Sequence, residues 1–149
     1  MAEQKSYKPI GGVVKASLYA VGEITSIDDV VEGHGIEVEL VDYGSSYEEL
    51  FCPKQGLVSV EHTLTLRALR NNAEPWLDAR FIERCAAEGV VAWVELATGE
   101  RLRIGWSRRF GFEQALRLEE MKFLSGKQPT DSPCVVLMLR SHDTQSVIV

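Results

Sequence analysis

Apolar and polar residues alternate most regularly between Leu57 and Ala68, and the rest of the chain is organised around this stretch. One face of the alternation carries Val58, Val60, His62, Leu64, Leu66 and Ala68, and the other carries Glu61, Thr63, Thr65 and Arg67. A period of two is typical of a half-buried strand, so we predict a β-strand here. His62 falls on the inward face, where we expect a core histidine with satisfied hydrogen bonds.

The residues after this strand have a helical pattern. Apolar residues recur at four-residue spacing, at Leu77, Phe81 and Cys85. Asn71 or Asn72 suits the N-cap, Pro75 suits the first turn, and Gly89 suits the left-handed residue that ends a helix. We predict an amphipathic helix over about residues 74–88, with one face packed on a sheet.

Further strands are expected on both sides of this helix. A hairpin follows it, with strands at Val90–Leu96 and Arg101–Trp106 around a turn at Thr98-Gly99. Other segments with strand character cover residues 13–24, 36–42, 47–52, 115–124 and 134–139. The last of these is apolar on both faces, which predicts the most central strand.

Three local features are expected to interrupt these strands. Pro53 to Gly56 should end the strand that begins at Tyr47, because proline cannot donate a backbone hydrogen bond. Hydrophobic residues change face near Glu119-Glu120, which suggests a bulge or a bend. Ser141 to Thr144 has the composition of a turn.

The sum of these elements predicts a mainly β fold. Consecutive strands with short connections favour antiparallel pairing. We therefore expect an antiparallel β-sandwich or open barrel of about 7–8 strands, with one flanking helix at about residues 74–88. The length of 149 residues predicts a single domain over residues 1–149, in which residues 1–9 form a loose N-terminal tail.

Composition and charge narrow the class of function. The chain is 45% hydrophobic and 26% charged, as is ordinary for a globular protein, and no apolar run is long enough to span a membrane. The polar N-terminus does not resemble a signal peptide, so a cytoplasmic location is expected.

Charge is unevenly distributed along the chain. Residues 1–75 hold 6 basic against 12 acidic residues, while residues 76–149 hold 10 of each. This balance argues against nucleic-acid binding, because affinity for phosphate comes mainly from clustered lysine and arginine. Either an acidic face meets a basic face of a partner or second copy, or two solvated surfaces differ by chance.

The sequence offers no catalytic constellation, and we predict no enzyme activity, metal site or cofactor. The cysteines, Cys52, Cys85 and Cys134, have no disulfide or zinc spacing. Adjacent acidic pairs such as Glu48-Glu49 are expected to be solvated surface, because a general acid needs burial. An enzyme would require His62, His142 and Asp143 to converge in one cleft.

The best candidate for a functional surface is the second strand of the hairpin and its continuation. Arginines there alternate with apolar and aromatic residues, and the candidate interface comprises Arg101, Arg103, Trp106, Arg108 and Arg109. Arginine and tryptophan are enriched at protein interfaces. Stacking of single-stranded nucleic acid and a purely structural hairpin are the other interpretations.

The order of elements over roughly residues 57–144 resembles phage and prophage tail-structure proteins, the tail-tube and distal-tail group. The two segments that carry the resemblance are VEHTLTLRALRNNAEPWLDARFIERCAAEGVVAWVELATGERLRIGWS and LRLEEMKFLSGKQPTDSPCVVLMLRSHDT. The resemblance implies a β-sandwich or barrel with one helix, and a non-enzymatic protein that stacks into rings, usually hexameric, through sheet edges. It also implies phage-type structural partners and a place in an assembled tail particle.

Two functions therefore remain as hypotheses. The first is a structural protein of phage or prophage type that self-associates through β-strand edges into a ring or tube. The alternative is a monomeric β-barrel binding module for a small ligand or single-stranded nucleic acid, using Trp93, Trp106, Arg101 and Arg103.

Overall fold

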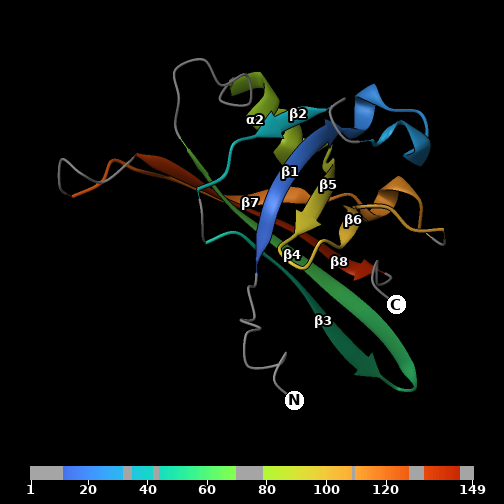
Figure 1. Cartoon of the computed structure of the whole chain (residues 1–149). Coiled ribbons are helices and arrows are strands. Elements are labelled where there is room, and N and C mark those ends of the chain that lie inside the picture. The colour runs from blue at the N-terminus through green and yellow to red at the C-terminus, as the bar shows by residue number, and fades with distance from the viewer. Residues whose placement is uncertain are drawn as a thin grey trace, which may run out of the picture.

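A computed structural model describes residues 12–31, 35–41, 44–69, 79–108, 110–127 and 133–144. Within these residues the chain forms eight strands in two four-stranded antiparallel sheets, with one α-helix (Figure 1). The predicted mainly β, antiparallel fold is confirmed, and the sheets do not close into a barrel. The expected N-terminal tail, residues 1–9, lies outside the described residues.

The first sheet has the strand order β2-β1-β5-β6. Its strands are β1 (Val13–Ala20), β2 (Ile36–Val38), β5 (Val90–Leu96) and β6 (Arg101–Ile104). The pair β5 and β6 is the predicted hairpin, in register from Ala92 opposite Ile104 to Glu95 opposite Arg101. β6 is thus an outer strand of this sheet.

The second sheet has the order β3-β4-β8-β7 and longer strands. Its strands are β3 (Ser46–Lys54), β4 (Leu57–Leu69), β7 (Arg117–Leu124) and β8 (Cys134–Thr144). β8 lies inside the sheet, as its apolar sequence predicts. The register shifts between Leu118 and Glu120, which confirms the predicted bulge.

The main core lies between the two sheets. The inward face of β4 supplies Val60, Leu64, Leu66 and Ala68, all buried. Leu64, Leu66 and Ala68 pack with buried residues of the first sheet such as Leu18, Val94 and Ile104. Single bridges between Leu40 and Ala68, and between Val90 and Leu116, link the two sheets.

A second cluster covers the outer face of the first sheet. Tyr19, Val91 and Trp93 are buried there against Val30. The segment that covers this face runs from Val21 to Val30 and contains two 3-10 helices, η1 (Val21–Glu23) and η2 (Ile27–Asp29). A third 3-10 helix, η4 (Phe112–Gln114), precedes β7.

The helix α2 (Ala79–Ala87) lies against β7 and buries Cys85 in the main core. It ends before Gly89, which has a φ of +93° as the sequence predicts. The expected start of the helix, at residues 74–78, lies outside the described residues.

Several predicted strand ends are wrong, including those of β2, which ends at Val38 instead of residue 42, and β6, which ends at Ile104 instead of Trp106. β3 continues through Pro53 to Lys54, which is possible because β3 is an outer strand and proline can occupy an edge. Ser141 to Thr144 is not a turn but the end of β8, where Thr144 pairs with Val60 of the long strand β4. The first strand ends at Ala20 and continues as η1 instead of extending to residue 24.

Candidate functional site

The structure places the first two residues of the predicted interface, Arg101 and Arg103, on β6, an outer strand of the first sheet. Arg101 and Arg103 are exposed on β6, while Leu102 and Ile104 point into the core. Arg101 pairs with Glu95 across the hairpin, with Nε 3.3 Å from Oε1. Trp106 is half-buried and Arg108 is exposed. Arg109 lies outside the described residues. The strand therefore presents a basic edge.

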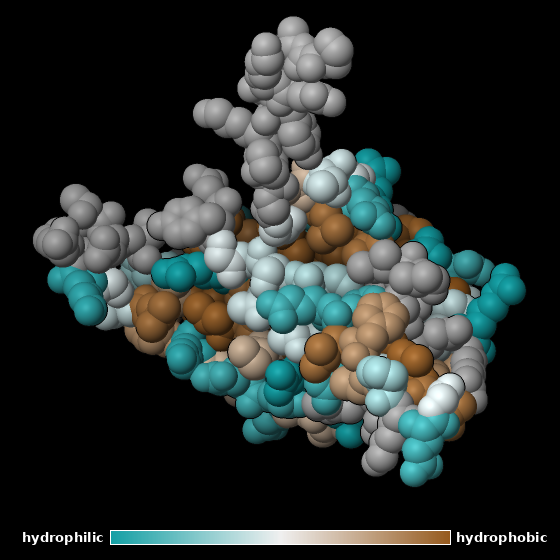
Figure 2. Space-filling model, turned by 90° about the horizontal axis from the view of Figure 1, so that it is seen from below, coloured by the Kyte–Doolittle hydropathy of each residue, from teal (hydrophilic) through white to brown (hydrophobic). Residues whose placement is uncertain are grey.

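A second surface feature was not predicted from the sequence. The hairpin of β3 and β4 projects from the body at the lower right of Figure 1. We call residues 50–58 the apolar arm. It carries four large exposed hydrophobic side chains: Leu50, Phe51, Leu57 and Val58. Figure 2 shows hydrophobic residues at the surface on the same side of the molecule.

The arm is exposed because the two sheets differ in length. β4 has 13 residues, whereas the described strands of the first sheet have at most 8. The alternation correctly puts Val58 on the same face as Val60, but Val58 is 58% exposed and Val60 only 3%. Within the described residues, the inward face of β4 is therefore covered at Val60 but not at Val58.

The opposite end of the second sheet also exposes apolar side chains. Phe123 and Leu124, at the end of β7, are 53% and 37% exposed. Leu124 lies opposite Cys134, whose β4 partner is Leu69 at the far end from the arm. One subunit therefore presents two different apolar surfaces, one at each end of the sheet.

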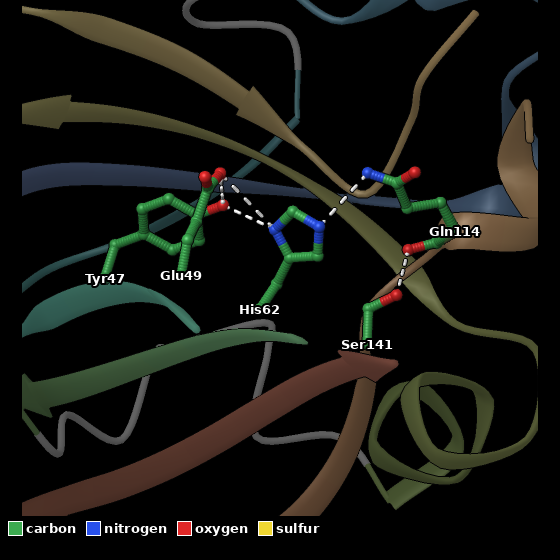
Figure 3. Close-up of polar contacts among 5 residues, drawn as sticks. All are labelled: Tyr47, Glu49, His62, Gln114 and Ser141. Atoms are coloured by element: carbon green, nitrogen blue, oxygen red, sulfur yellow. Dashed lines mark hydrogen bonds and ion pairs between the residues drawn. The ribbon is translucent and has the colours of Figure 1, made fainter. Parts of the chain in front are cut away.

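A buried polar cluster lies at the root of the arm (Figure 3). It joins three strands and η4, and consists of Tyr47, Glu49, His62, Gln114 and Ser141. The Tyr47 hydroxyl lies 2.5 Å from Oε2 of Glu49 and 2.6 Å from Nδ1 of His62. Nε2 of Gln114 lies 3.3 Å from Nε2 of His62. Ser141 donates a hydrogen bond of 2.6 Å to the backbone carbonyl of Gln114.

The proton positions in this cluster follow from the distances. The Tyr47 hydroxyl donates to the Glu49 carboxylate, so its oxygen is left to accept a hydrogen bond from Nδ1–H of His62. Nε2 of the neutral imidazole then accepts from the Gln114 amide. This tautomer is assigned from the hydrogen-bond network. Burial, and then the hydrogen bond to Glu49, raises the pKa of Tyr47 well above its ordinary value.

The polar cluster corrects one prediction and confirms another. His62 is a hydrogen-bonded core histidine, as expected. Glu49 was expected on the solvated surface, but its side chain is only 3% exposed. Alternate residues of a strand face opposite sides, so Glu49 points inward while Glu48 points to solvent. The sequence carried one sign of this burial: Tyr47 and Glu49 are two positions apart, so both side chains lie on the same face of the strand.

The residues of the enzyme hypothesis cannot be assembled from the described side chains. The backbone places Ser141 opposite His62, but the side chains of His142 and Asp143 lie outside the described residues. Within the described part of the chain, no group of three or more His, Cys, Asp and Glu residues is placed to hold a metal ion. The hydrogen bonds of the polar cluster join β3, β4, β8 and η4.

Among the residues of the alternative binding module, Arg103 lies directly opposite Trp93 on the paired strands β5 and β6. Trp93 lines a pocket on the first sheet with Lys15, Ser17 and Glu37. Arg101 and Arg103 do not line this pocket. A second pocket lies beside Tyr19. Among the helices in the described ranges, none is both long and apolar enough to cross a membrane.

Comparison with protein-family models, curated proteins and solved structures found no match.

Proposed function

We propose that this chain is a non-enzymatic structural protein of phage or prophage type. In this role, copies associate through β-strand edges into a ring or tube. The observation that carries the proposal is the apolar arm, with Leu57 75% and Val58 58% exposed at its tip. Contiguous exposed apolar side chains on a rigid element mark sites of protein association.

The arrangement of surfaces favours a ring or a tube over a two-fold dimer. The arm and the Phe123–Leu124 end lie at opposite ends of the second sheet. Contacts between two different surfaces of one subunit are heterologous, and heterologous contacts generate closed rings or open filaments. Outer strands of both sheets supply backbone groups for pairing with a neighbour.

The root of the arm is rigid, which suits an element that carries a contact. The polar cluster satisfies the buried hydroxyl of Tyr47 and both ring nitrogens of His62. A fully satisfied buried network fixes one conformation of the strands it joins. The arm thus leaves the body in a defined direction, so association does not require it to be ordered first.

The proposed partners are further copies of this chain and other structural proteins of the same particle. The proposed place of action is the cytoplasm of an infected cell or the assembled tail particle. The alternative, a small-ligand or single-strand binding module, is less supported because Arg101 and Arg103 do not line the pocket that Trp93 lines.

Serine substitutions at the tip of the arm test the proposal. Burying one such side chain contributes about 1.5–3 kcal/mol, so the variant Leu57→Ser/Val58→Ser should weaken self-association at least about tenfold. The matched control is Val14→Ser, since Val14 is an exposed apolar residue of β1, 47% exposed. The measurement is size-exclusion chromatography with light scattering. Equal association of both variants and the parent protein would count against the arm as the contact.

A further inference from the structure

We infer that the acidic outer strand β3 of one copy pairs with the basic outer strand β6 of the next copy. This inference rests on the proposed self-association and identifies which two edges meet. The juxtaposition brings Glu48 of one copy close to Arg103 of its neighbour.

The first half of the contact is the edge of β3. This strand has nine residues, and its only sheet neighbour within the described residues is β4. Glu48 is exposed on its outer face and forms no ion pair within the part of the chain that the structure describes. Glu61 of β4 lies opposite Leu50, diagonally adjacent to Glu48 on the same face. The edge is therefore acidic, and the exposed side chain of Leu50 lies beside it.

The second half is the edge of β6. Its sheet neighbour among the described residues is β5, and no described strand pairs with its other edge. Arg103 is exposed opposite Trp93 and has no ion-pair partner in the described ranges. Arg101 is exposed on the same face but already pairs with Glu95. Arg103 is therefore the cation of this strand that remains for an acidic neighbour.

The charges oppose pairing of identical edges. Two β3 strands side by side would bring their Glu48 carboxylates to one interface, and two β6 strands would do the same with their arginines. Like charges across an interface cost free energy and exclude such partners. The combination of β3 with β6 removes this cost. It is also heterologous, which is the geometry that a ring or tube needs.

The other two outer strands fit less well. β7 carries both signs of charge: Lys122 lies 3.5 Å from Glu120, Glu119 lies 3.7 Å from Arg140 of β8, and Arg117 is exposed at the start of the strand. β2 is acidic at Glu37 but has only three residues, too few for a stable pair. Among the four outer strands described, β3 and β6 are therefore the two that are longer than three residues and whose exposed charged side chains are of a single sign, acidic on β3 and basic on β6.

The contact also explains the position of the arm. β6 has four residues, so pairing along it supplies only a few backbone hydrogen bonds. A stable interface buries about 800 Å² on each partner, which is more than such a short strand provides. β3 continues directly into the apolar arm, so a copy paired along β3 brings its body next to Leu50 and Phe51. In this contact, the opposite charges decide which two strands pair, and burial of apolar side chains of the arm supplies most of the free energy of association.

Reversal of one charge on each strand provides the test. Glu48→Arg and Arg103→Glu should each weaken self-association at least about tenfold, because each creates like charges at every contact. An equimolar mixture should restore association, since each copy then meets an opposite charge on both sides. Association of the parent protein should also weaken as salt is raised. Sedimentation velocity measures the assembled fraction in all of these samples.

Two controls apply the same reversals to the other outer strands. Glu37→Arg on β2 and Arg117→Glu on β7 change exposed charges and should leave association within about twofold of the parent. Circular dichroism checks that each variant is folded. The neutral variants Glu48→Gln and Arg103→Gln replace any reversal that fails to fold, and should weaken association by a smaller factor.

The outcomes separate the inference from the proposed function. If the parent protein assembles and the mixture fails to rescue the two reversals, or the reversals have no effect, the β3–β6 pairing is wrong while self-association stands. A larger effect of Glu37→Arg or Arg117→Glu would assign the contact to β2 or β7. A parent protein that does not assemble at any accessible concentration overturns both.

Discussion

The hydroxyl oxygen of Tyr47 lies 2.6 Å from Nδ1 of His62, and this contact joins β3 to β4 where the apolar arm leaves the body. The same hydroxyl lies 2.5 Å from the buried carboxylate of Glu49. One side chain thus satisfies two buried polar groups. This explains how a strand pair can continue beyond the sandwich without losing its position.

Removal of that hydroxyl should destabilise the fold. Tyr47→Phe removes one hydrogen-bond partner from the buried carboxylate of Glu49 and one from the imidazole of His62, which should lower the free energy of unfolding by about 1–3 kcal/mol. Urea unfolding followed by circular dichroism measures the change. The matched control is Tyr19→Phe, because the Tyr19 hydroxyl contacts only the backbone carbonyl of Val31 among the contacts described. A Tyr47→Phe variant no less stable than the control would contradict this role.

Gly89 should resist substitution for two separable reasons. Its φ is +93°, and a Cβ there would lie 2.9 Å from the Cβ of Ala115. Gly99 has the same φ of +93° but open space around it. Strain from the left-handed backbone costs about 1–2 kcal/mol in both Gly89→Ala and Gly99→Ala. Thermal unfolding should show a further loss in Gly89→Ala alone, and equal losses would show that the close approach is unimportant.

The buried thiol of Cys85 should make stability depend on alkaline pH. Burial raises the pKa of Cys85 from 9.0 to about 11. Above pH 9 the unfolded chain loses this proton while the folded chain keeps it, so stability falls as pH rises through that range. The loss should reach about 2 kcal/mol near pH 11. The variant Cys85→Ala should lose less between pH 8 and pH 11, and parallel pH profiles would contradict the assignment.

Thiol reactivity should differ among the three cysteines. Cys52 is half-buried on the arm, whereas Cys85 and Cys134 are buried. Access and thiolate formation both control reaction, so a disulfide reagent at pH 8 should modify one thiol quickly and two only after unfolding. Cys52→Ser should abolish the fast phase. If the fast phase persists in that variant, another cysteine is exposed.

The sequence predicted local structure well because the signals there are periodic. The alternation from Val60 to Ala68 predicted β4 and its buried face, and Gly89 marked the end of the helix. The hairpin of β5 and β6 followed from its turn and from the alternation of Arg101 and Arg103 with Leu102 and Ile104. Each of these patterns depends on residues close together in the chain.

The features that sequence reasoning missed depend on contacts between distant segments. The exposure of Val58 follows from the length of the first sheet and not from the pattern of β4 itself. The burial of Glu49 depends on Tyr47 of its own strand and on His62 of the adjacent strand. His62 is 13 positions away from Glu49 in the sequence. Likewise, the composition of Ser141–Thr144 indicated a turn, but pairing with β4 keeps this segment extended. Tertiary contacts overrode local preference there.

Sedimentation velocity of the unmodified chain over a wide concentration range shows whether copies of this chain associate. If they do, the weight-average mass rises with concentration from 16.6 kDa toward a multiple of it, and ring or tube particles become visible by electron microscopy. A single species of 16.6 kDa at every concentration up to the millimolar range would contradict the proposed self-association.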